Sequence, residues 1–267
     1  MTEADVGRKA IITGGASGIG AEIARRVAAA GARVAIVDRD AGHAERVAGE
    51  IGDRDRAFPV TADVRDAEQV RAAVAACAEE MGGVDTLVVS AGVFAIGTLA
   101  ETSAETWERT IGVNLTGAFN VLRTTAPHLS ASGRGRIVTI SSDCGRQGYA
   151  LLSAYCASKF GLVGLTESVA AELAPHGVTA NCICPVGIPT TAMGVQVADW
   201  KMAKTGRDRA QIEAAAARTN PLGRNATERD VADAAMFFLS EQAGFLTGVI
   251  LDVDGGARLK GVPAVDE

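Results

Sequence analysis

The residues "KAIITGGASGIG", Lys9 to Gly20, indicate the class of fold. It begins with a short apolar run, Lys9 to Thr13, and continues with seven residues of which four are glycine. A helical pattern of apolar residues follows and ends at Gly31, a residue type that often caps helix C-termini. A strand, a glycine-rich turn and a helix in this order are typical of a nucleotide-binding unit, in which the helix N-terminus faces phosphate groups.

The rest of the chain repeats this alternation. Six more apolar runs occur: "RVAIVD" (Arg33–Asp38), "AFPVTADV" (Ala57–Val64), "TLVVSAG" (Thr86–Gly92), "GRIVTISS" (Gly135–Ser142), "VTANCICP" (Val178–Pro185) and "GVILDVDGG" (Gly248–Gly256). Helices are expected at about Asp66–Met81, Ser103–Leu129, Ser153–Pro175 and Glu228–Leu239. This pattern predicts an α/β fold in one domain, residues 1–267: a doubly wound parallel sheet of about seven strands with helices on both faces.

Residues 186–223 interrupt the alternation and are too long for a plain connection. We expect a long loop that acts as a lid, because long connections in compact domains are often functional. The stretch has enough apolar side chains to cover a site: Met193, Val195, Val197, Trp200 and Met202.

Composition excludes several classes of partner. A net charge of −6 over 267 residues gives no electrostatic basis for binding nucleic acid or an anionic membrane. No apolar run reaches membrane-spanning length, and the first ten residues are too polar for a signal peptide. The five cysteines lack disulfide-scaffold spacing, Cys182 and Cys184 are expected to pack, and no cysteine or histidine pattern predicts a metal site. We expect a soluble, cytoplasmic protein.

The end of the second strand bears on the choice of nucleotide. Asp38 stands where a carboxylate can accept hydrogen bonds from the adenosine ribose hydroxyls and would repel a 2′-phosphate. This favours NAD over NADP. Arg39 follows directly and is able to receive a 2′-phosphate, so NADP stays open as the alternative.

A tyrosine and a lysine lie four residues apart in "SAYCASK", Ser153 to Lys159. On a helix this spacing places Tyr155 and Lys159 on one face, close to the strand end "ISS" (Ile140 to Ser142) at the carboxyl edge of the sheet. An ammonium group near a phenol favours the phenolate, which suits proton transfer. Cys156 is expected to point elsewhere on the helix and to pack.

From about Lys9 to Gly256 the chain resembles the short-chain dehydrogenase/reductase family. The shared motifs occur in order: the TGxxxGxG turn, Asp63–Val64, Ser90-Ala91-Gly92, Asn114, Ser142, Tyr155-x-x-x-Lys159, the Pro185 loop, "NPLGR" (Asn220–Arg224) and "DGG" (Asp254–Gly256). Two positions depart from the family pattern, since Ser90 replaces a common asparagine and Val186 a common glycine. The resemblance implies a Rossmann-type, NAD(P)-dependent oxidoreductase that interconverts a secondary alcohol and a ketone.

The resemblance also implies roles for individual residues. Tyr155 would be the acid–base group and Lys159 would lower its pKa and bind the nicotinamide ribose. Ser142 would orient the substrate oxygen, and Asn114 would hold a water of a proton relay. The cofactor would contact Gly14, Ser17, Gly18, Ile19, Gly20, Asp38, Asp63, Val64, Ser90, Ala91, Gly92, Tyr155, Lys159, Pro185, Ile188 and Thr190.

The substrate is expected to be a compact secondary alcohol or ketone, cyclic or hydroxylated. By position, its pocket would be lined by Val93, Phe94, Asp143, Cys144, Tyr149, Gly187 and residues from Met193 to Trp200. The direction of turnover stays open. Two alternatives remain: a non-catalytic, redox-sensing NAD(P)-binding module, and an NADPH-dependent ketone or 3-oxoacyl reductase.

Assembly is expected to follow the family norm, a homotetramer. Two helical stretches, Ser103–Leu129 and Phe160–Leu173, are poor in charge on more than one face, which favours a helix-mediated interface. The tail "ARLKGVPAVDE" (Ala257–Glu267) is expected to be disordered or to pack on a neighbouring subunit.

Overall fold

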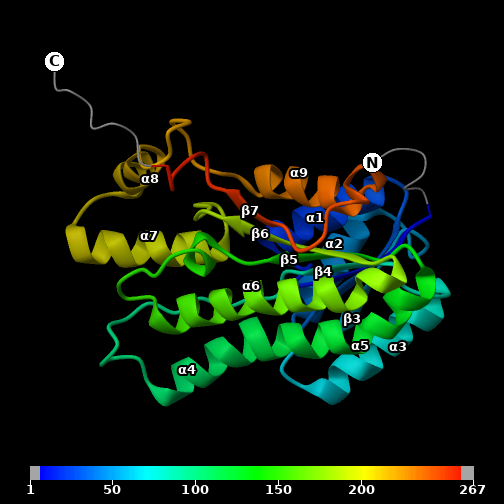
Figure 1. The fold of residues 1–267 in the computed structure, drawn as a ribbon. Helices are drawn as coiled ribbons and strands as arrows, with labels where there is room; N and C mark the ends of the chain where they lie inside the picture. Colours follow the sequence, from blue (N-terminus) through cyan, green and yellow to red (C-terminus); the bar gives the residue numbers. More distant parts are fainter. Residues whose placement is uncertain (1–6, 260–267) are drawn as a thin grey trace.

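A parallel sheet forms the centre of the structure, a computed structural model in which residues 7–259 are described (Figure 1). Its strands are β1 (Lys9–Thr13), β2 (Arg33–Asp38), β3 (Ala57–Thr61), β4 (Thr86–Val89), β5 (Arg136–Ile140), β6 (Thr179–Pro185) and β7 (Ile250–Val253). They are ordered β3-β2-β1-β4-β5-β6-β7, and every neighbouring pair is parallel. The predicted doubly wound sheet is confirmed, and the strand order reverses direction between β1 and β4.

Helices cover both faces of the sheet, as Figure 1 shows. They are α1 (Gly18–Ala29), α2 (Ala41–Ile51), α3 (Ala67–Met81), α4 (Ala104–Ile111), α5 (Gly117–Ser132), α6 (Ser153–Leu173), α7 (Ala192–Thr205), α8 (Arg209–Ala217) and α9 (Glu228–Leu239). One buried cluster joins α1, α2 and α9 to the sheet, and a second joins α3, α5 and α6 to its other face. In the described part of the chain, no helix combines the length and apolar character needed to cross a membrane.

Local signals in the sequence explain where several helices begin and end. The carboxylate of Asp66 accepts the backbone N–H groups of Glu68 and Gln69 at 2.9 and 3.1 Å, which starts α3. Gly82 ends the same helix in the left-handed conformation, with φ +67°. The boundaries expected for α3 and α9 are therefore confirmed.

One expectation for the chain path was wrong. Residues 186–223 are not a long loop, because α7 and α8 occupy most of this stretch. Thr191 and Asp208 start these helices by accepting backbone N–H groups at 3.0 and 2.8 Å. The helical stretch expected at Ser103–Leu129 is confirmed as α4 and α5, which are joined by a π-helical turn, Gly112–Thr116.

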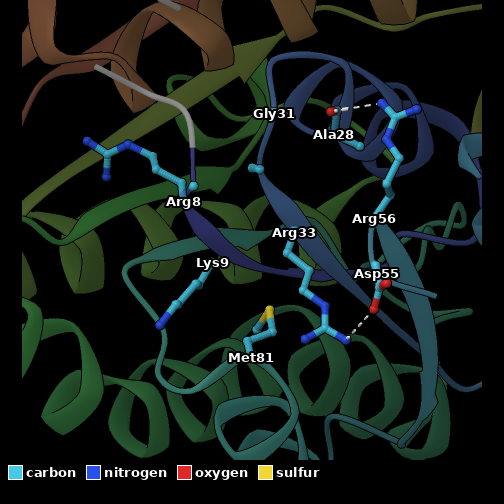
Figure 2. A pocket seen from close by; sticks show the side chains of 10 residues that line it. Arg8, Lys9, Ala28, Gly31, Arg33, Asp55, Arg56 and Met81 are labelled. Atoms are coloured by element: carbon cyan, nitrogen blue, oxygen red, sulfur yellow. Dashed lines mark hydrogen bonds and ion pairs between the residues drawn. The ribbon is translucent and has the colours of Figure 1, made fainter. Parts of the chain in front are cut away.

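The amino ends of β1 and β2 lie at the opposite end of the sheet from the glycine turn. A hollow of about 190 Å³ is surrounded there by basic side chains, among them Lys9, Arg33 and Arg56 (Figure 2). Arg33 donates to the carboxylate of Glu80 at 2.8 Å, and Arg56 Nη2 donates to the Ala28 carbonyl at 3.2 Å. Because protein groups already engage these cations, the carboxyl end of the sheet is the better candidate for a ligand site.

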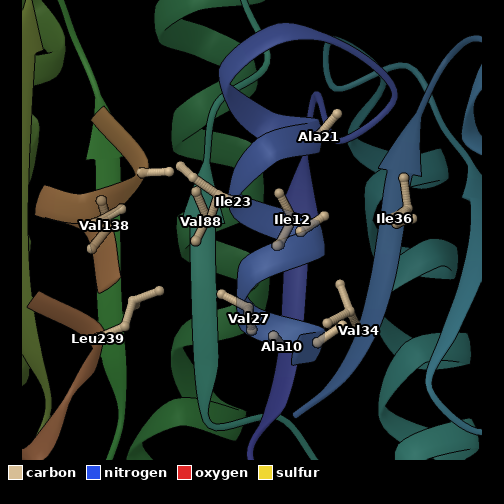
Figure 3. Close-up of a cluster of buried hydrophobic side chains, with 14 of the residues drawn as sticks. Ala10, Ile12, Ala21, Ile23, Val27, Val34, Ile36, Val88, Val138 and Leu239 are labelled. Carbon is tan, nitrogen blue, oxygen red and sulfur yellow. The ribbon is translucent and has the colours of Figure 1, made fainter. Parts of the chain in front are cut away.

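The core beneath α1 holds the glycine turn in place. Ile12 in the centre of β1 is fully buried and is paired in register with Ile36 of β2 and Val88 of β4. Ile23 and Val27 of α1 belong to the same cluster, which Figure 3 shows from the helix side. The packing of α1 on β1 therefore fixes the direction in which the helix N-terminus points.

Replacing Ile12 with alanine tests this core. We expect the free energy of unfolding to fall by about 2–5 kcal/mol, because the loss of three side-chain carbons leaves a cavity at the centre of the sheet. Urea denaturation followed by circular dichroism measures the change. Leu99→Ala is the control, since Leu99 is 79% exposed and its truncation should change stability by no more than about 0.5 kcal/mol. Equal effects of the two substitutions would contradict the packing described here.

Candidate active site

The glycine turn between β1 and α1 makes direct backbone contacts. A Cβ on Gly14, which has φ +68°, would lie 2.6 Å from the amide nitrogen of Ala91, and a Cβ on Gly20 would collide with the Gly14 carbonyl oxygen. Ser17, the N-cap of α1, is exposed and makes no capping bond through its side chain, and the first turn has no acidic residue. The turn therefore presents a hydroxyl and helix N-terminal N–H groups, which suits a phosphate. It contains these predicted cofactor residues: Gly14, Ser17, Gly18, Ile19 and Gly20.

Asp38 lies at the end of β2, next to this turn. Its Oδ2 accepts the backbone N–H of Ala16 at 3.2 Å, and its Oδ1 accepts that of Asp40 at 3.1 Å. The carboxylate thus faces the turn, where a ribose hydroxyl would find an acceptor. Arg39 is exposed at the edge of this region.

The segment after β3 contains a tight ion pair that the sequence interpretation missed. Arg65 Nη2 lies 2.6 Å from Asp63 Oδ2, and hydrogen bonds from Arg65 hold the pKa of Asp63 below its ordinary value, with a smaller contribution from the charge of Arg39. Val64 is buried, and its carbonyl accepts the Nδ2–H of Asn120 from α5 at 3.0 Å. The motif residues Asp63 and Val64 are therefore held in place by Arg65 and Asn120, and the signal for the pair was the adjacent arginine in "DVR".

The strand-end triplet Ser90-Ala91-Gly92 is followed by a clamp from Asn114. The Asn114 Oδ1 accepts the Val93 N–H at 2.8 Å, and its Nδ2 donates to the Val93 carbonyl and to Ser158 Oγ, both at 3.0 Å. Asn114 lies in the π-helical turn and is 1% exposed. Its side chain therefore joins the loop after β4 to α6, and π turns of this kind are frequent at functional sites.

Lys159 connects α6 to the end of β5. Its Nζ donates to the Ile140 carbonyl at 2.9 Å, and the Ser141 hydroxyl donates to the Lys159 carbonyl at 3.0 Å. Lys159 Nζ lies 5.6 Å from the centre of the Tyr155 ring. Ser141 therefore ties the end of β5 to α6, and Tyr155 is held one helical turn before Lys159.

Burial shapes the proton affinities of this pair. Burial raises the pKa of the Tyr155 phenol, the Cys144 thiol and the Asp143 carboxylate raise it further, and a hydrogen bond with Ser142 opposes the rise. Burial also lowers the pKa of Lys159 to about 8. The lowered tyrosine pKa implied by the resemblance is thus not produced by these side chains alone.

Ser142 belongs to a chain of hydrogen bonds that continues to the surface. Its hydroxyl donates to Asp143 Oδ1 at 2.7 Å, and its oxygen accepts the Cys144 N–H at 3.2 Å. The hydroxyl of Tyr149 donates to Asp143 Oδ2 at 2.8 Å and accepts from Gln147 at 2.6 Å. Two predicted pocket residues, Asp143 and Tyr149, are therefore linked to Ser142 by hydrogen bonds.

The opposite wall of the site is apolar. The rings of Phe94 and Tyr155 pack edge to face, with centroids 5.0 Å apart. The wall is completed by Cys144, Cys156, Ile96, Leu152, Met193 and Val197. Cys156 packs as expected, but in the same cluster as Tyr155. Leu151, directly before this cluster, adopts a left-handed conformation with φ +70° that is uncommon for leucine.

The loop after β6 carries the last group of predicted cofactor residues. Pro185 ends β6, Ile188 is buried, and the Val186 N–H donates to the carbonyl of Val253 at 3.1 Å. The hydroxyl of Thr190 lies 2.9 Å from both carboxylate oxygens of Glu228. The structure therefore fastens Thr190 to the start of α9.

Helix α7 closes over both halves of the crevice. A Cβ on Gly92 would lie 3.5 Å from Met193 Cε and 3.7 Å from Lys159 Nζ, so these two side chains converge on one point. Thr191 approaches the glycine turn, with its Cγ2 3.5 Å from a Cβ on Gly18. Among the residues expected to line the pocket, Gly187 and Val195 are exposed.

Comparisons with known proteins agree with this geometry. The family model described as short chain dehydrogenase matches residues 8–202. The chain is 38% identical to the inactive 2-(S)-hydroxypropyl-CoM dehydrogenase 2 of Xanthobacter autotrophicus, over 88% of this chain and 98% of that one. It is 37% identical to D-threitol dehydrogenase of Mycolicibacterium smegmatis, over 95% of this chain and 94% of that one. A variant of actinorhodin polyketide ketoreductase solved with NADPH superposes with a TM-score of 0.89 at 34% identity, over 96% and 99% of the two chains.

Replacing the buried Lys159 should raise the stability of the protein and lower its activity. Because the pKa of Lys159 falls from 10.5 to about 8, its charge costs folding free energy below pH 8, less between 8 and 10.5, and none above. At pH 7, Lys159→Met should raise the free energy of unfolding by about 1 kcal/mol or more. The melting temperature should rise by about 2–4 °C per kcal/mol. Turnover should fall at least about a hundredfold.

Calorimetry and a turnover assay on the same preparations measure both effects. The control is Lys204→Met, because Lys204 is exposed on α7 and its replacement should leave stability and activity nearly unchanged. A lower melting temperature for Lys159→Met at pH 7 would show that the buried ammonium stabilises the fold.

Proposed function

The chain belongs to the short-chain dehydrogenase/reductase family and is an oxidoreductase of alcohols and ketones, and we propose that it transfers hydride between a secondary alcohol and NAD with Tyr155 as acid–base group. One observation carries the proposal. The phenol of Tyr155 is buried beside Ser142, with the Lys159 ammonium 5.6 Å from its ring, at the carboxyl end of β5. In doubly wound sheets, ligands bind outside this end of the strands.

The residues present fit a dinucleotide. The exposed N-terminus of α1 with Ser17 would hold the pyrophosphate, and the carboxylate of Asp38 would accept the adenosine ribose hydroxyls. Gly92 and Lys159 border the point where the nicotinamide ribose would lie. When bound, NAD supplies the hydride acceptor, and the protein supplies position and proton transfer.

In the oxidation direction, Tyr155 takes the proton of the substrate hydroxyl while Ser142 holds the reacting oxygen. The charge of Lys159 favours the phenolate form, and burial opposes it. The raised pKa of Tyr155 means that its protonated form, which reduction needs, prevails at neutral pH. Above about pH 8, Lys159 loses the charge that favours the phenolate, so alkaline pH has opposing effects on oxidation. Phe94 and Met193 pack in one apolar cluster with Tyr155, where they exclude water from its phenol ring.

Tyr155→Phe separates catalysis from binding. Removing the phenolic oxygen should lower kcat for alcohol oxidation by about a hundred- to ten-thousandfold, because no other group replaces the proton acceptor. NADH affinity, measured by fluorescence titration, should change little. Tyr149→Phe is a matched control in which the other tyrosine of the chain loses its hydroxyl. Tight NADH binding without any turnover that depends on Tyr155 would instead support a non-catalytic module.

The choice of NAD rests on Asp38. Its carboxylate faces the glycine turn, so a 2′-phosphate placed there would meet a negative charge. The alternative, an NADPH-dependent ketoreductase, is favoured by Arg39 and by a ketoreductase relative that was solved with NADPH.

Titrations with both reduced dinucleotides decide between them. The wild type should bind NADH at least about tenfold more tightly than NADPH, and Asp38→Asn should reduce this preference by removing the repulsion. Arg39→Ala should leave NADH binding unchanged. Tighter binding of NADPH than of NADH by the wild type would reverse the assignment.

We also propose a helix-mediated homotetramer and a cytoplasmic location. Large aromatic side chains are exposed on α4, α5 and α6, which lie side by side in Figure 1: Trp107 (43%), Phe119 (45%) and Phe160 (46%). All five cysteines are free thiols, which suits a reducing compartment.

Light scattering after size exclusion tests the assembly. The mass should be close to four times the 27.3 kDa of one chain. Phe119→Arg with Phe160→Arg should dissociate it, because two charges would be placed on the apolar contact. Phe245→Arg, at a fully exposed position outside these three helices, is the control. A monomer in the wild type would refute the proposal.

A further inference from the structure

Asp143 is a carboxylate at the reaction centre held only by neutral donors. Its Oδ1 accepts the Ser142 hydroxyl at 2.7 Å and the Cys144 N–H at 2.9 Å, and its Oδ2 accepts the Tyr149 hydroxyl at 2.8 Å. Within residues 7–259, no lysine, arginine or histidine forms an ion pair with it. Arg146, three residues away, instead donates to Asp252 at 3.0 Å. The half-buried carboxylate of Asp143 can therefore accept a further hydrogen bond.

The carboxylate of Asp143 has one hydrogen-bond acceptor position left, and it lies on Oδ2. Two carboxylate oxygens offer about four lone-pair positions, and the protein fills three of them. Oδ1 takes two donors and Oδ2 takes only the hydroxyl of Tyr149. Burial and the neighbouring Asp143 raise the pKa of Tyr149, so its hydroxyl keeps its proton and remains a donor. The open position on Oδ2 accepts a hydrogen bond and offers none.

The same carboxylate determines which groups Ser142 can bind. An ionised carboxylate only accepts hydrogen bonds, so the single proton of the Ser142 hydroxyl is directed to Asp143. In this state the Ser142 oxygen has only lone pairs left for Tyr155. When Ser142 holds the reacting oxygen of the substrate, whose proton goes to Tyr155, the Ser142 hydroxyl donates to that oxygen and gives up its bond to Asp143 Oδ1.

We propose, on the basis of the alcohol oxidation assigned above, that the substrates are neutral vicinal diols or polyols whose second hydroxyl donates to Asp143. Ser142 Oγ and the Asp143 carboxylate are adjacent, so two substrate oxygens bound to them are also adjacent, as in a vicinal diol. A substrate carboxylate, sulfonate or phosphate at this place would be repelled. The apolar wall of Phe94, Leu152 and Met193 accommodates the carbon skeleton.

Paired substrates test the assignment. For the wild type, kcat/KM should be at least about tenfold higher for butane-2,3-diol than for butan-2-ol, the value of one hydrogen bond to a charged group. Asp143→Asn should lower this ratio at least about fivefold, since the amide supplies one acceptor oxygen where the carboxylate has two. It should also raise the relative kcat/KM for the anion 3-hydroxybutyrate, because the repelling charge is gone. If Asp143→Asn does not fold, as judged by its melting curve, Asp143→Ala serves in its place.

Two controls separate recognition from general disruption. Tyr149→Phe frees a lone pair on Asp143 and keeps the charge, so the preference for the diol should be retained or increased. Asp55→Asn removes an exposed carboxylate at the opposite end of the sheet and should change neither ratio.

The outcomes distinguish this inference from the proposed function. Equal kcat/KM values for diol and mono-alcohol in the wild type, with turnover that still depends on Tyr155, overturn the diol assignment alone. An unchanged ratio in Asp143→Asn, or no gain with 3-hydroxybutyrate, also overturns it. No turnover of any of these alcohols that depends on Tyr155 overturns the proposed function itself.

Discussion

The hydrogen bond from Lys159 Nζ to the Ile140 carbonyl is the constraint on which the rest of the site depends. It joins the first turns of α6 to the last residue of β5, and the bond from Ser141 to the Lys159 carbonyl reinforces it. With both elements fixed, Ser142, two residues beyond the strand, meets Tyr155, one turn before Lys159 on the helix. The cost of burying an ammonium group is therefore tolerated where it positions the two groups that are proposed to act on the substrate.

The proposed site has two parts, one beside β1 and β2 and the other beside β5 and β6. On the β1–β2 side, backbone contacts at Gly14 and Gly20 leave no room for side chains. The N-terminus of α1 therefore lies close to β1, as binding of a phosphate would require. On the β5–β6 side, Ser142 and Asp143 lie opposite the apolar cluster around Phe94. The hydroxyl groups and the carbon skeleton of a substrate would therefore contact different surfaces. Helix α7 covers both halves and is the element through which a bound substrate would be enclosed.

Most of the fold was predictable because buried parallel strands are continuous apolar runs, and these marked all seven strands. The helices in 186–223 were not, because α7 carries Gly194 and the β-branched Val195 and Val197, which weaken a helical pattern. The π turn at Asn114 has no sequence period of its own. Tyr155 and Lys159 follow from spacing, whereas the bond between Ser142 and Asp143 depends on side-chain rotamers that no pattern encodes.

Isotope transfer shows whether hydride moves directly from the alcohol to the nicotinamide in the crevice between α7 and the strand ends. The enzyme would be incubated with NAD and a secondary alcohol deuterated at the carbinol carbon, and the NADH formed would be analysed by proton NMR. Direct hydride transfer predicts deuterium at nicotinamide C4, on one face only, with none acquired from deuterated solvent when the alcohol is unlabelled. Deuterium that enters from solvent, or that is spread over both faces, would contradict it.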